Sequence, residues 1–251
     1  MFKKIIPILF LLIITSCQRE EFKQLVVSAQ LSATKLDTLN VNIALAVVAE
    51  ASLDISDESE APSITPPEPQ DTAFDLPDLP AGLEPVEGAK VVFAGETLDD
   101  IGGGYYQGSP DSLIPLTRYN ISIETPDGNV SGNVILPGEF SIIAPPGDTV
   151  IFADSLQNLN VVWTHSDSAS SYMVRLVKIG GGVLYSEVVS DTTLLLDPQI
   201  FGASPQGDYL ISITAIYGKF ESGVPGYSNL QGATGYLSAA LTPDVVAVRI
   251  Q

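Results

Sequence analysis

The chain has 251 residues, with 11 Lys+Arg against 30 Asp+Glu, a formal charge of −19, one cysteine and one histidine. The acidic excess excludes binding of nucleic acid by charge, because no basic stripe is present to neutralise phosphates, and it disfavours docking on anionic lipid for the same reason. One cysteine excludes an intrachain disulfide and a zinc site built on cysteines. The 21 Gly and 18 Pro indicate turns and short strands, and the length predicts one or two domains.

The N-terminus has the pattern of a secretory signal. Lys3 and Lys4 precede an apolar stretch from Ile5 to Ile14. A stable transmembrane helix needs about 20 apolar residues, so this stretch is too short, and residues 1–16 are interpreted as a signal peptide that is removed. Loss of the two lysines reduces the 11 Lys+Arg to 9, which makes the mature chain more acidic still.

An aliphatic residue, two small residues and a cysteine end this segment, as Ile14-Thr15-Ser16-Cys17. The sequence resembles the lipobox of bacterial lipoproteins, in which the cysteine is lipidated and becomes the first residue. The resemblance implies two or three acyl chains on Cys17, which anchor a protein stably, whereas one chain binds only marginally. The alternative is an ordinary signal peptide with a cysteine at its end by chance.

A short charged cluster follows the predicted lipidation site: Gln18, Arg19, Glu20 and Glu21. A residue other than aspartate after the cysteine disfavours retention at the inner membrane under the enterobacterial sorting rule. The cluster also resembles the export signal of surface lipoproteins in the Bacteroidetes. These resemblances imply an outer-membrane protein exposed at the cell surface; the alternative is that the cluster only begins a solvated linker.

Residues 17–87 are predicted to hold the lipidated N-terminus and an acidic, proline-rich tether. No basic residue lies between Lys35 and Lys90, and seven prolines fall between Pro62 and Pro85. Like charges repel and proline blocks a regular helix, so the stretch from residue 50 to 87 is expected to be extended and mobile. Calcium binding by its carboxylates is the alternative, although the Asp-x-Asp-x-Asp-Gly spacing is absent.

One segment inside this region has strand character. Residues 39–48 alternate larger apolar side chains with small or polar ones, which is the period of a strand. Residues 44–51 are rich in alanine and would also suit a helix. A strand at 39–48, added to one of the later sheets, is predicted.

Residues 88–138 are predicted to form a small β-sandwich module. The alternation from Tyr119 to Ile123, the turn residues Pro126–Asn129 and the returning run Val130–Leu136 predict a hairpin. With Ala89-Lys90-Val91 and Gly104-Tyr105-Tyr106, this pattern resembles small transthyretin-like or carboxypeptidase-regulatory-like modules. It also resembles the start of lipoprotein domains of unassigned function from the Bacteroidetes.

Residues 139–251 are predicted to form a second β-sandwich. Its strand-like runs are Leu159-x-Val161-x-Trp163, Tyr172-x-Val174-x-Leu176 and Gly207-Asp208-Tyr209 continuing to Ala215. This succession resembles a fibronectin type III domain, with the small departure that Ser171 directly precedes Tyr172. Inward-facing apolar residues at every second position and turns every 8–12 residues are what such a sandwich needs.

Three aromatic residues are expected in the core of this sandwich. Trp163 and Tyr172 are predicted to lie between the two sheets, and Tyr209 stands where sandwiches place a tyrosine whose hydroxyl bonds to nearby backbone. The alternative for Trp163 is a platform on which a carbohydrate stacks. Val245–Ile250 is predicted to be the closing edge strand, where Arg249 would protect the edge from further pairing.

Candidates for catalysis are few. A Ser-His-Asp arrangement would need His165, which follows a strand in a polar loop without a Gly-x-Ser-x-Gly elbow. Asp99 and Asp100 border Gly102–Gly104, which is interpreted as a hairpin tip, because a phosphate loop needs a following helix and usually a lysine. No catalytic residue, no metal site and no cofactor is predicted.

Tyr105 and Tyr106 are adjacent and lie in a predicted strand. One of the two is therefore expected to face the core and the other to face solvent, where it could join a binding surface.

The expected fold is all-β, with two small β-sandwich modules of the immunoglobulin or fibronectin III-like kind behind a flexible acidic tether. The expected function is a lipid-anchored, non-catalytic binding or spacer module of the cell envelope. Its expected partners are the membrane, through the lipid anchor, and an unidentified protein or glycan, but no nucleic acid. The alternative is an accessory subunit of an outer-membrane transport or secretion complex, which an exposed hydrophobic patch would favour; a hydrolase is the third interpretation.

Overall fold

The computed structural model describes residues 22–36, 39–53, 79, 81–153, 157–218 and 230–251. In these ranges the chain forms 19 strands and one short 3-10 helix, at Pro198–Phe201. None of the helices in the described part is long and apolar enough to cross a membrane. The prediction of an all-β fold is therefore confirmed.

Most strands belong to one large sheet. Its strands are β1 (Phe22–Leu36), β2 (Leu39–Leu53), β3 (Leu83–Pro85), β6 (Asp99–Gly102), β7 (Tyr105–Gly108), β11 (Thr149–Ile151), β13 (Ser171–Lys178), β14 (Gly182–Val189), β16 (Gly207–Tyr217), β18 (Thr234–Thr242) and β19 (Val245–Ile250). Its main path runs in the order β11-β19-β16-β18-β1-β2-β7-β6. Beside this path, β13 pairs with β16 and β14, and β3 pairs with β2.

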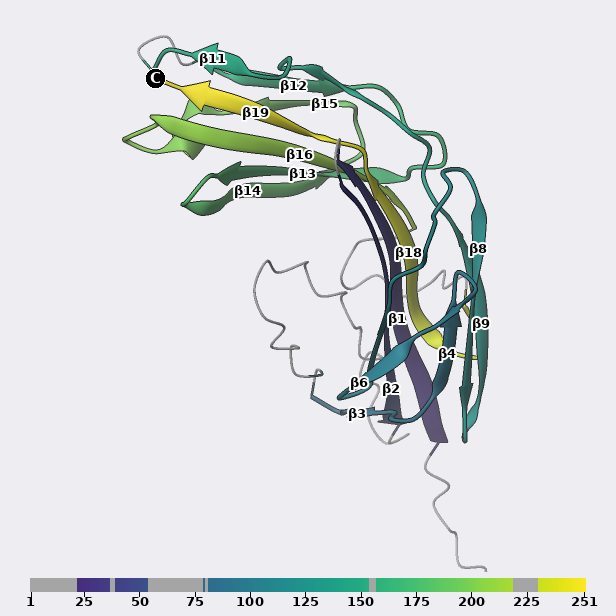
Figure 1. The fold of residues 1–251 in the computed structure, drawn as a ribbon. Coiled ribbons are helices and arrows are strands. Elements are labelled where there is room, and N and C mark those ends of the chain that lie inside the picture. The colour runs from purple at the N-terminus through teal and green to yellow at the C-terminus, as the bar shows by residue number, and fades with distance from the viewer. Residues whose placement is uncertain (1–21, 37–38, 54–78, 80, 154–156, 219–229) are drawn as a thin grey trace, which may run out of the picture.

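Two smaller sheets cover this large sheet. One contains β4 (Lys90–Phe93), β5 (Glu96–Thr97), β8 (Arg118–Thr125), β9 (Gly128–Ile135) and β17 (Leu230–Gln231), and the other contains β10 (Ile142–Ala144), β12 (Leu159–Trp163) and β15 (Thr193–Leu196). Each forms a two-layered sandwich with its own part of the large sheet, and the strands of the two sandwiches run in clearly different directions (Figure 1). The large sheet is continuous from one sandwich to the other.

The N-terminal strands form a long hairpin. β1 and β2 are antiparallel over their whole length, from the pair Phe22 and Leu53 to the pair Leu36 and Leu39. On its other side β1 pairs in parallel with β18, near the C-terminus. The strand predicted at 39–48 is thus present, longer than expected, and the helical alternative for 44–51 is wrong.

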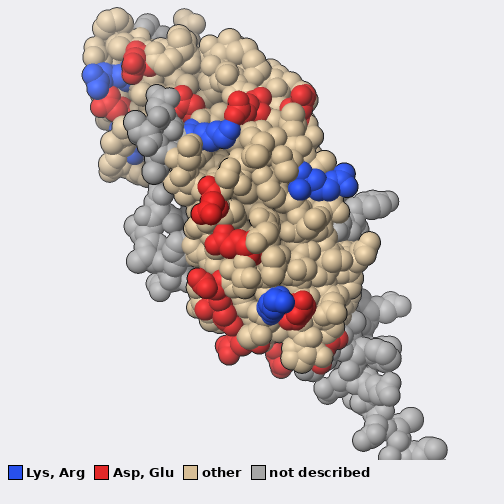
Figure 2. All heavy atoms as spheres, turned by 45° about the vertical axis from the view of Figure 1, so that its right-hand side comes forward, with Lys and Arg blue, Asp and Glu red and all other residues tan. Residues whose placement is uncertain are grey.

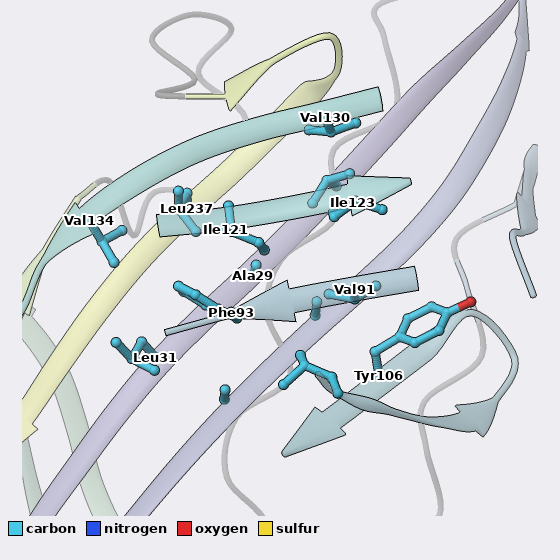
Figure 3. Packing of buried hydrophobic residues seen from close by; sticks show 14 of the residues in the cluster. Ala29, Leu31, Val91, Phe93, Tyr106, Ile121, Ile123, Val130, Val134 and Leu237 are labelled. Carbon is cyan, nitrogen blue, oxygen red and sulfur yellow. The ribbon is translucent and has the colours of Figure 1, made fainter. Parts of the chain in front are cut away.

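The first core lies between this hairpin and the five-stranded sheet. Large side chains come from the covering sheet, among them Phe93, Ile121 and Ile123, while β1 and β2 contribute small ones such as Ala29 and Ala46 (Figure 3). Small residues opposite large ones allow two sheets to interdigitate without voids. Burying one Phe or Ile side chain contributes roughly 1.5–3 kcal/mol, so the large side chains of the covering sheet stabilise this sandwich.

The second core lies between β10-β12-β15 and the part of the large sheet formed by β11, β19, β16, β13 and β14. Its buried residues come from two ranges, 140–215 and 246–250. Two layers of strands around this core match the sandwich predicted for the C-terminal half of the chain.

The grouping of the strands differs from the predicted division into 88–138 and 139–251. The first core draws on residues 25–48, 86–136 and 230–241, so β17 and β18 belong to the first sandwich. The physical cause is edge pairing, because the end of β16 pairs with β18 through Ala215 and Leu241. The sheet therefore continues across the boundary, and neither sandwich is a contiguous piece of sequence.

The region expected to be a tether also differs. Among the described residues, strand structure is already present from Phe22, well before residue 88. β3 pairs with the end of β2 through Leu83 and Ala51, so both described ends of the acidic stretch belong to the sheet. Residues 54–78 and 80, where most of the predicted tether falls, lie outside the described residues.

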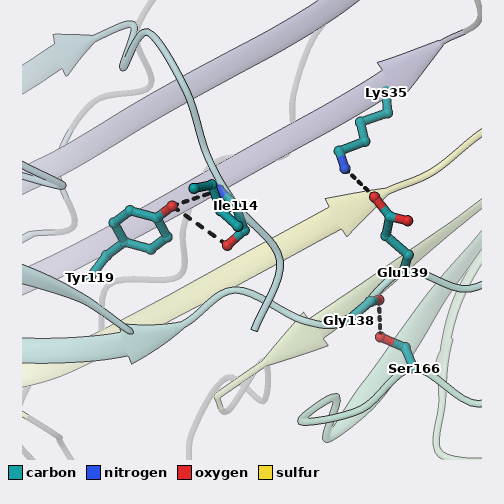
Figure 4. A network of polar contacts seen from close by, with 6 residues as sticks. All are labelled: Lys35, Ile114, Tyr119, Gly138, Glu139 and Ser166. Carbon is teal, nitrogen blue, oxygen red and sulfur yellow. Dashed lines mark hydrogen bonds and ion pairs between the residues drawn. The ribbon is translucent and has the colours of Figure 1, made fainter. Parts of the chain in front are cut away.

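Polar contacts hold the segment that connects the first sandwich to the second. Lys35, in β1, forms an ion pair with Glu139 (Figure 4). The neighbouring Gly138 carbonyl accepts a hydrogen bond from the Ser166 hydroxyl at 2.6 Å, and the Gly138 N–H donates to the Asp167 carbonyl at 2.8 Å. Side chain and backbone together hold the segment between β9 and β10 against the second sandwich.

Candidate functional site

The residues predicted for lipidation and sorting are Cys17, Gln18, Arg19, Glu20 and Glu21. All five lie outside the described residues. Their roles remain predictions from the sequence.

The aromatic residues expected in the second core are buried there. Trp163 and Tyr172 are each 2% exposed, and their rings meet edge to face with centroids 5.5 Å apart. Phe140 adds a second edge-to-face contact to Tyr172 at 5.9 Å. The indole of Trp163 faces the interior between the sheets, where no carbohydrate could stack on it.

Tyr209 closes the other side of this core. It is fully buried, and its hydroxyl donates a hydrogen bond to the Pro205 carbonyl, four residues earlier. Its ring packs edge to face on Phe201 at 5.2 Å, and the Lys178 ammonium lies 5.5 Å from its centroid. This is the corner arrangement in which a tyrosine fixes the start of a strand.

His165 contributes to structure at the same place. Its Nδ1 lies 3.3 Å from the Tyr172 hydroxyl, which also accepts a hydrogen bond from the Ser166 N–H at 2.9 Å. The Ser166 hydroxyl is buried and donates to the Gly138 carbonyl instead of facing the imidazole. The adjacent serine and histidine therefore do not form a nucleophile and its base.

Asp100 fastens the β6–β7 hairpin to the loop before β4. Its carboxylate accepts hydrogen bonds from the Gly88 N–H at 2.8 Å and the Gly102 N–H at 2.9 Å. These two backbone donors lower the pKa of Asp100 below its ordinary value. The prediction that Gly102–Gly104 forms a hairpin tip is confirmed.

The expectation that one of two adjacent tyrosines faces solvent is wrong. Tyr106 lies in the first core, and Tyr105 lies on the opposite face of the sheet, where it packs with Val26, Val47 and neighbouring residues in a separate buried cluster. Alternation along a strand separates the two rings, but both faces of this sheet are covered here. Neither tyrosine offers an exposed binding surface.

The Tyr106 hydroxyl anchors the chain next to it. It donates to the Val86 carbonyl at 2.7 Å and accepts from the Ala89 N–H at 2.9 Å. Burial raises the pKa of Tyr106, so its hydroxyl stays protonated and can donate. The ring thereby ties residues 86–89 to β7.

Charge is sparse on the described surface. The face seen in Figure 2 is mostly uncharged, with scattered acidic groups and a few basic ones. Among the described residues, no three of His, Cys, Asp or Glu are grouped so that they could hold a metal ion.

Several apolar side chains of the second sandwich are exposed, two sets of which lie on its sheets. Ile143 and Leu195, 57% and 58% exposed, lie on the outer side of the three-stranded sheet. Val183, Leu184 and Val188 lie on β14, at the edge of the large sheet. The sequence predicted the closing edge at Val245–Ile250 instead. That prediction is wrong, because β19 pairs with β11 on one side and with β16 on the other, and strand order is not visible in the local pattern.

Comparison with known proteins gives no family. No family model matches the chain, and no curated protein matches it. Solved structures that match include the fibronectin(III)-like modules of Clostridium thermocellum CbhA, with 13% identity, 92% of this chain and 94% of that chain covered, and a TM-score of 0.30.

Two further matches come from chicken. The FN1–FN3 domains of CNTN1 are 13% identical, with 87% of this chain and 66% of that chain covered and a TM-score of 0.26. A segment of two fibronectin type-III domains from tenascin is 16% identical, with 86% and 97% covered and a TM-score of 0.23.

Proposed function

We propose that this protein is a lipid-anchored component of the cell envelope whose two sandwiches act together as a non-catalytic binding or spacer module. The observation that carries the proposal is the continuous large sheet, which passes from one sandwich to the other through β1, β18 and β16. A shared sheet resists bending far better than a flexible linker between two domains. Such a body can hold one end at a fixed distance from the other.

The position of the predicted anchor supports a spacer. Four residues lie between Cys17 and the start of β1, and the five steps from Cys17 to Phe22 span at most about 18 Å. The start of β1 and the second sandwich lie at opposite ends of the molecule (Figure 1). With acyl chains on Cys17, the first sandwich would lie close to the membrane and the second would project away from it.

Membrane fractionation tests the anchor. The parent chain should sediment with membranes after a high-salt wash, and Cys17→Ala should appear in the soluble fraction. Glu20→Ala/Glu21→Ala keeps the cysteine and serves as the matched variant, which should remain on membranes. Retention of Cys17→Ala after the wash would contradict lipid anchoring.

Exposure at the cell surface is tested separately. Protease added to intact cells should degrade the parent protein but spare Glu20→Ala/Glu21→Ala if the cluster after Cys17 directs export to the surface. Survival of the parent, while a known surface protein is degraded, would place the chain on the inner side of the outer membrane.

A second candidate function is an accessory subunit of an outer-membrane transport or secretion complex. The exposed Ile143 and Leu195 support it, because apolar side chains on one sheet face are typical of a packing surface. Ile143→Lys/Leu195→Lys should then shift the protein from a large to a small species on native gels of detergent-solubilised membranes. An unchanged small species in both samples would argue against this candidate.

A further inference from the structure

The longest edge strand in the described part of the molecule is β14. It has eight residues and pairs only with β13. The strands that end the sheets elsewhere, β5, β6, β10, β11, β15 and β17, have two to four residues. An unpaired edge presents free N–H and C=O groups, and proteins usually keep such edges short or guard them.

Apart from Glu187, the sequence of β14 carries none of the side chains that usually guard an edge. Its sequence, GVLYSEVV, contains no lysine, arginine or proline. Val183, Leu184 and Val188 are 59%, 37% and 42% exposed, so these three side chains are open to solvent in the described part of the molecule. One irregularity, at Leu184, interrupts the pairing with β13, and the register is regular from Tyr185 to Val189.

The strand is complementary to itself about Ser186. Tyr185 and Glu187 flank this serine as a hydroxyl donor and a carboxylate acceptor, and they already form a hydrogen bond within one chain. Leu184 and Val188 follow as an apolar residue on each side. Antiparallel pairing about Ser186 would place each Tyr185 opposite the Glu187 of a second copy.

The neighbouring register, centred on Glu187, fits less well. Pairing about Glu187 would put two carboxylates directly opposite each other, which is destabilising in a sheet. Pairing about Ser186 keeps the two Glu187 carboxylates, which are the only charges of the two strands, apart. It also places the uncharged Tyr185 hydroxyl of one copy opposite each carboxylate. A second copy of β14 therefore offers a hydroxyl donor to each Glu187, whereas an acidic strand from another protein would repel it.

We propose that two copies of this chain associate through their β14 strands, antiparallel about a two-fold axis at Ser186, and so join two 11-stranded sheets into one of 22 strands. Such an interface is isologous and closes after two copies. It stands apart from the membrane anchor, because β14 belongs to the second sandwich. The inference does not depend on the proposed function.

Cysteine cross-linking tests the geometry. Directly opposite residues in antiparallel strands have Cα atoms about 4.5 or 5.5 Å apart, within the range that a disulfide bridges. Ser186→Cys in the full chain should give a reductant-sensitive band of two chains on oxidation. Ser122→Cys, an exposed position on β8, is the matched control. The parent chain is the second control, because it measures cross-linking through Cys17, which all three proteins contain. No excess of dimer in Ser186→Cys over these controls would overturn the proposal.

Charge at the same position gives a second test. Ser186→Lys and Ser186→Glu each place like charges opposite each other, so sedimentation of the full chain in detergent should show one chain per particle for either variant alone. An equal mixture of the two should restore a two-chain species. A parent that stays a single chain up to about 1 mM, which corresponds to a binding free energy of only about −4 kcal/mol, would overturn the proposal. A dimer that persists in pure Ser186→Lys would overturn it too.

Discussion

Val27 in β1 and Gly235 in β18 lie opposite each other in the parallel pair that joins the two ends of the chain. A Cβ atom at position 235 would stand 1.7 Å from the Val27 carbonyl oxygen, and the glycine has a φ of +129°. Only glycine permits this approach and this backbone conformation. The close contact is what brings β18 onto β1 and makes the large sheet continuous.

Gly235→Ala is therefore expected to destabilise the protein strongly. Overpacking against backbone costs about 1–3 kcal/mol, and the strained φ adds a similar amount. Urea denaturation followed by far-UV circular dichroism measures the loss. Gly147→Ala is the matched control, because its Cβ would meet nothing within 4 Å, and its effect should stay within about 0.5 kcal/mol. Equal stability of the two variants would show that β18 can shift on β1 without cost.

A second prediction compares two contacts at the junction between the sandwiches. Ser166→Ala should cost about 1–3 kcal/mol, because the buried Gly138 carbonyl loses its donor. Lys35→Ala should cost at most about 1 kcal/mol, because the side chains of Lys35 and Glu139 are 33% and 66% exposed and water screens the pair. Thermal unfolding of the two variants side by side tests the order. A larger loss in Lys35→Ala would mean that the ion pair dominates the junction.

The local β elements were predictable because their signals are local. Alternation from Tyr119 to Ile123 and the turn residues after it indicated the hairpin that β8 and β9 form. Trp163 and Tyr209 lie where strand patterns and the fibronectin III resemblance placed them. Each of these inferences rested on the pattern within single strands and on the turns that join them.

The first strand shows what a local reading missed. Leu25, Val27, Ala29, Leu31 and Ala33 face the first core at every second position, so the period was present in the sequence. Alanine and serine have weak strand propensity, and Val26 on the other face is buried too, which blurred the alternation.

The sequence predicted that the strand at 39–48 joins a later sheet, but it did not specify which strands pair over long range. On the side away from β2, β1 pairs with β18, about 200 residues later, and no local pattern specifies a partner at that distance. For the same reason the edge position of β14 and the sharing of one sheet by two sandwiches appeared only in the structure. The lipidation and sorting residues pose the opposite case, since their signal is wholly in the sequence.

The lowered pKa of Asp100 predicts a dependence of stability on pH. A carboxyl group with a lower pKa in the folded state stabilises the fold above its unfolded pKa, close to 3.8, and this contribution is lost as the pH falls toward the folded pKa. Asp100→Asn should therefore be less stable than the parent at pH 7, and the difference should shrink below pH 4. Urea denaturation at pH 7, 5 and 3.5 checks this. Asp99→Asn, its exposed neighbour, is the control, and a difference independent of pH would contradict the assignment.

The last prediction concerns the fragment Phe140–Gln251, which sequence patterns alone suggest as a separate module. All buried residues of the second core lie within it, so Trp163 should keep a blue-shifted emission that iodide quenches poorly. The fragment also carries β18, whose Leu237 and Leu241 are buried in the first core. Without β1 and the five-stranded sheet, these side chains become exposed.

The fragment is therefore expected to retain the second core yet bind the dye ANS and self-associate, whereas the full chain does neither through this surface. Leu237→Ser/Leu241→Ser should suppress dye binding in the fragment, since it removes the uncovered apolar side chains. The same double variant should destabilise the full chain by several kcal/mol, because it places hydroxyls in the first core. A solvent-like emission of Trp163 in the soluble fragment would mean that the second core depends on the first sandwich. Absence of dye binding would mean that other residues of the fragment pack over the apolar side chains of β18.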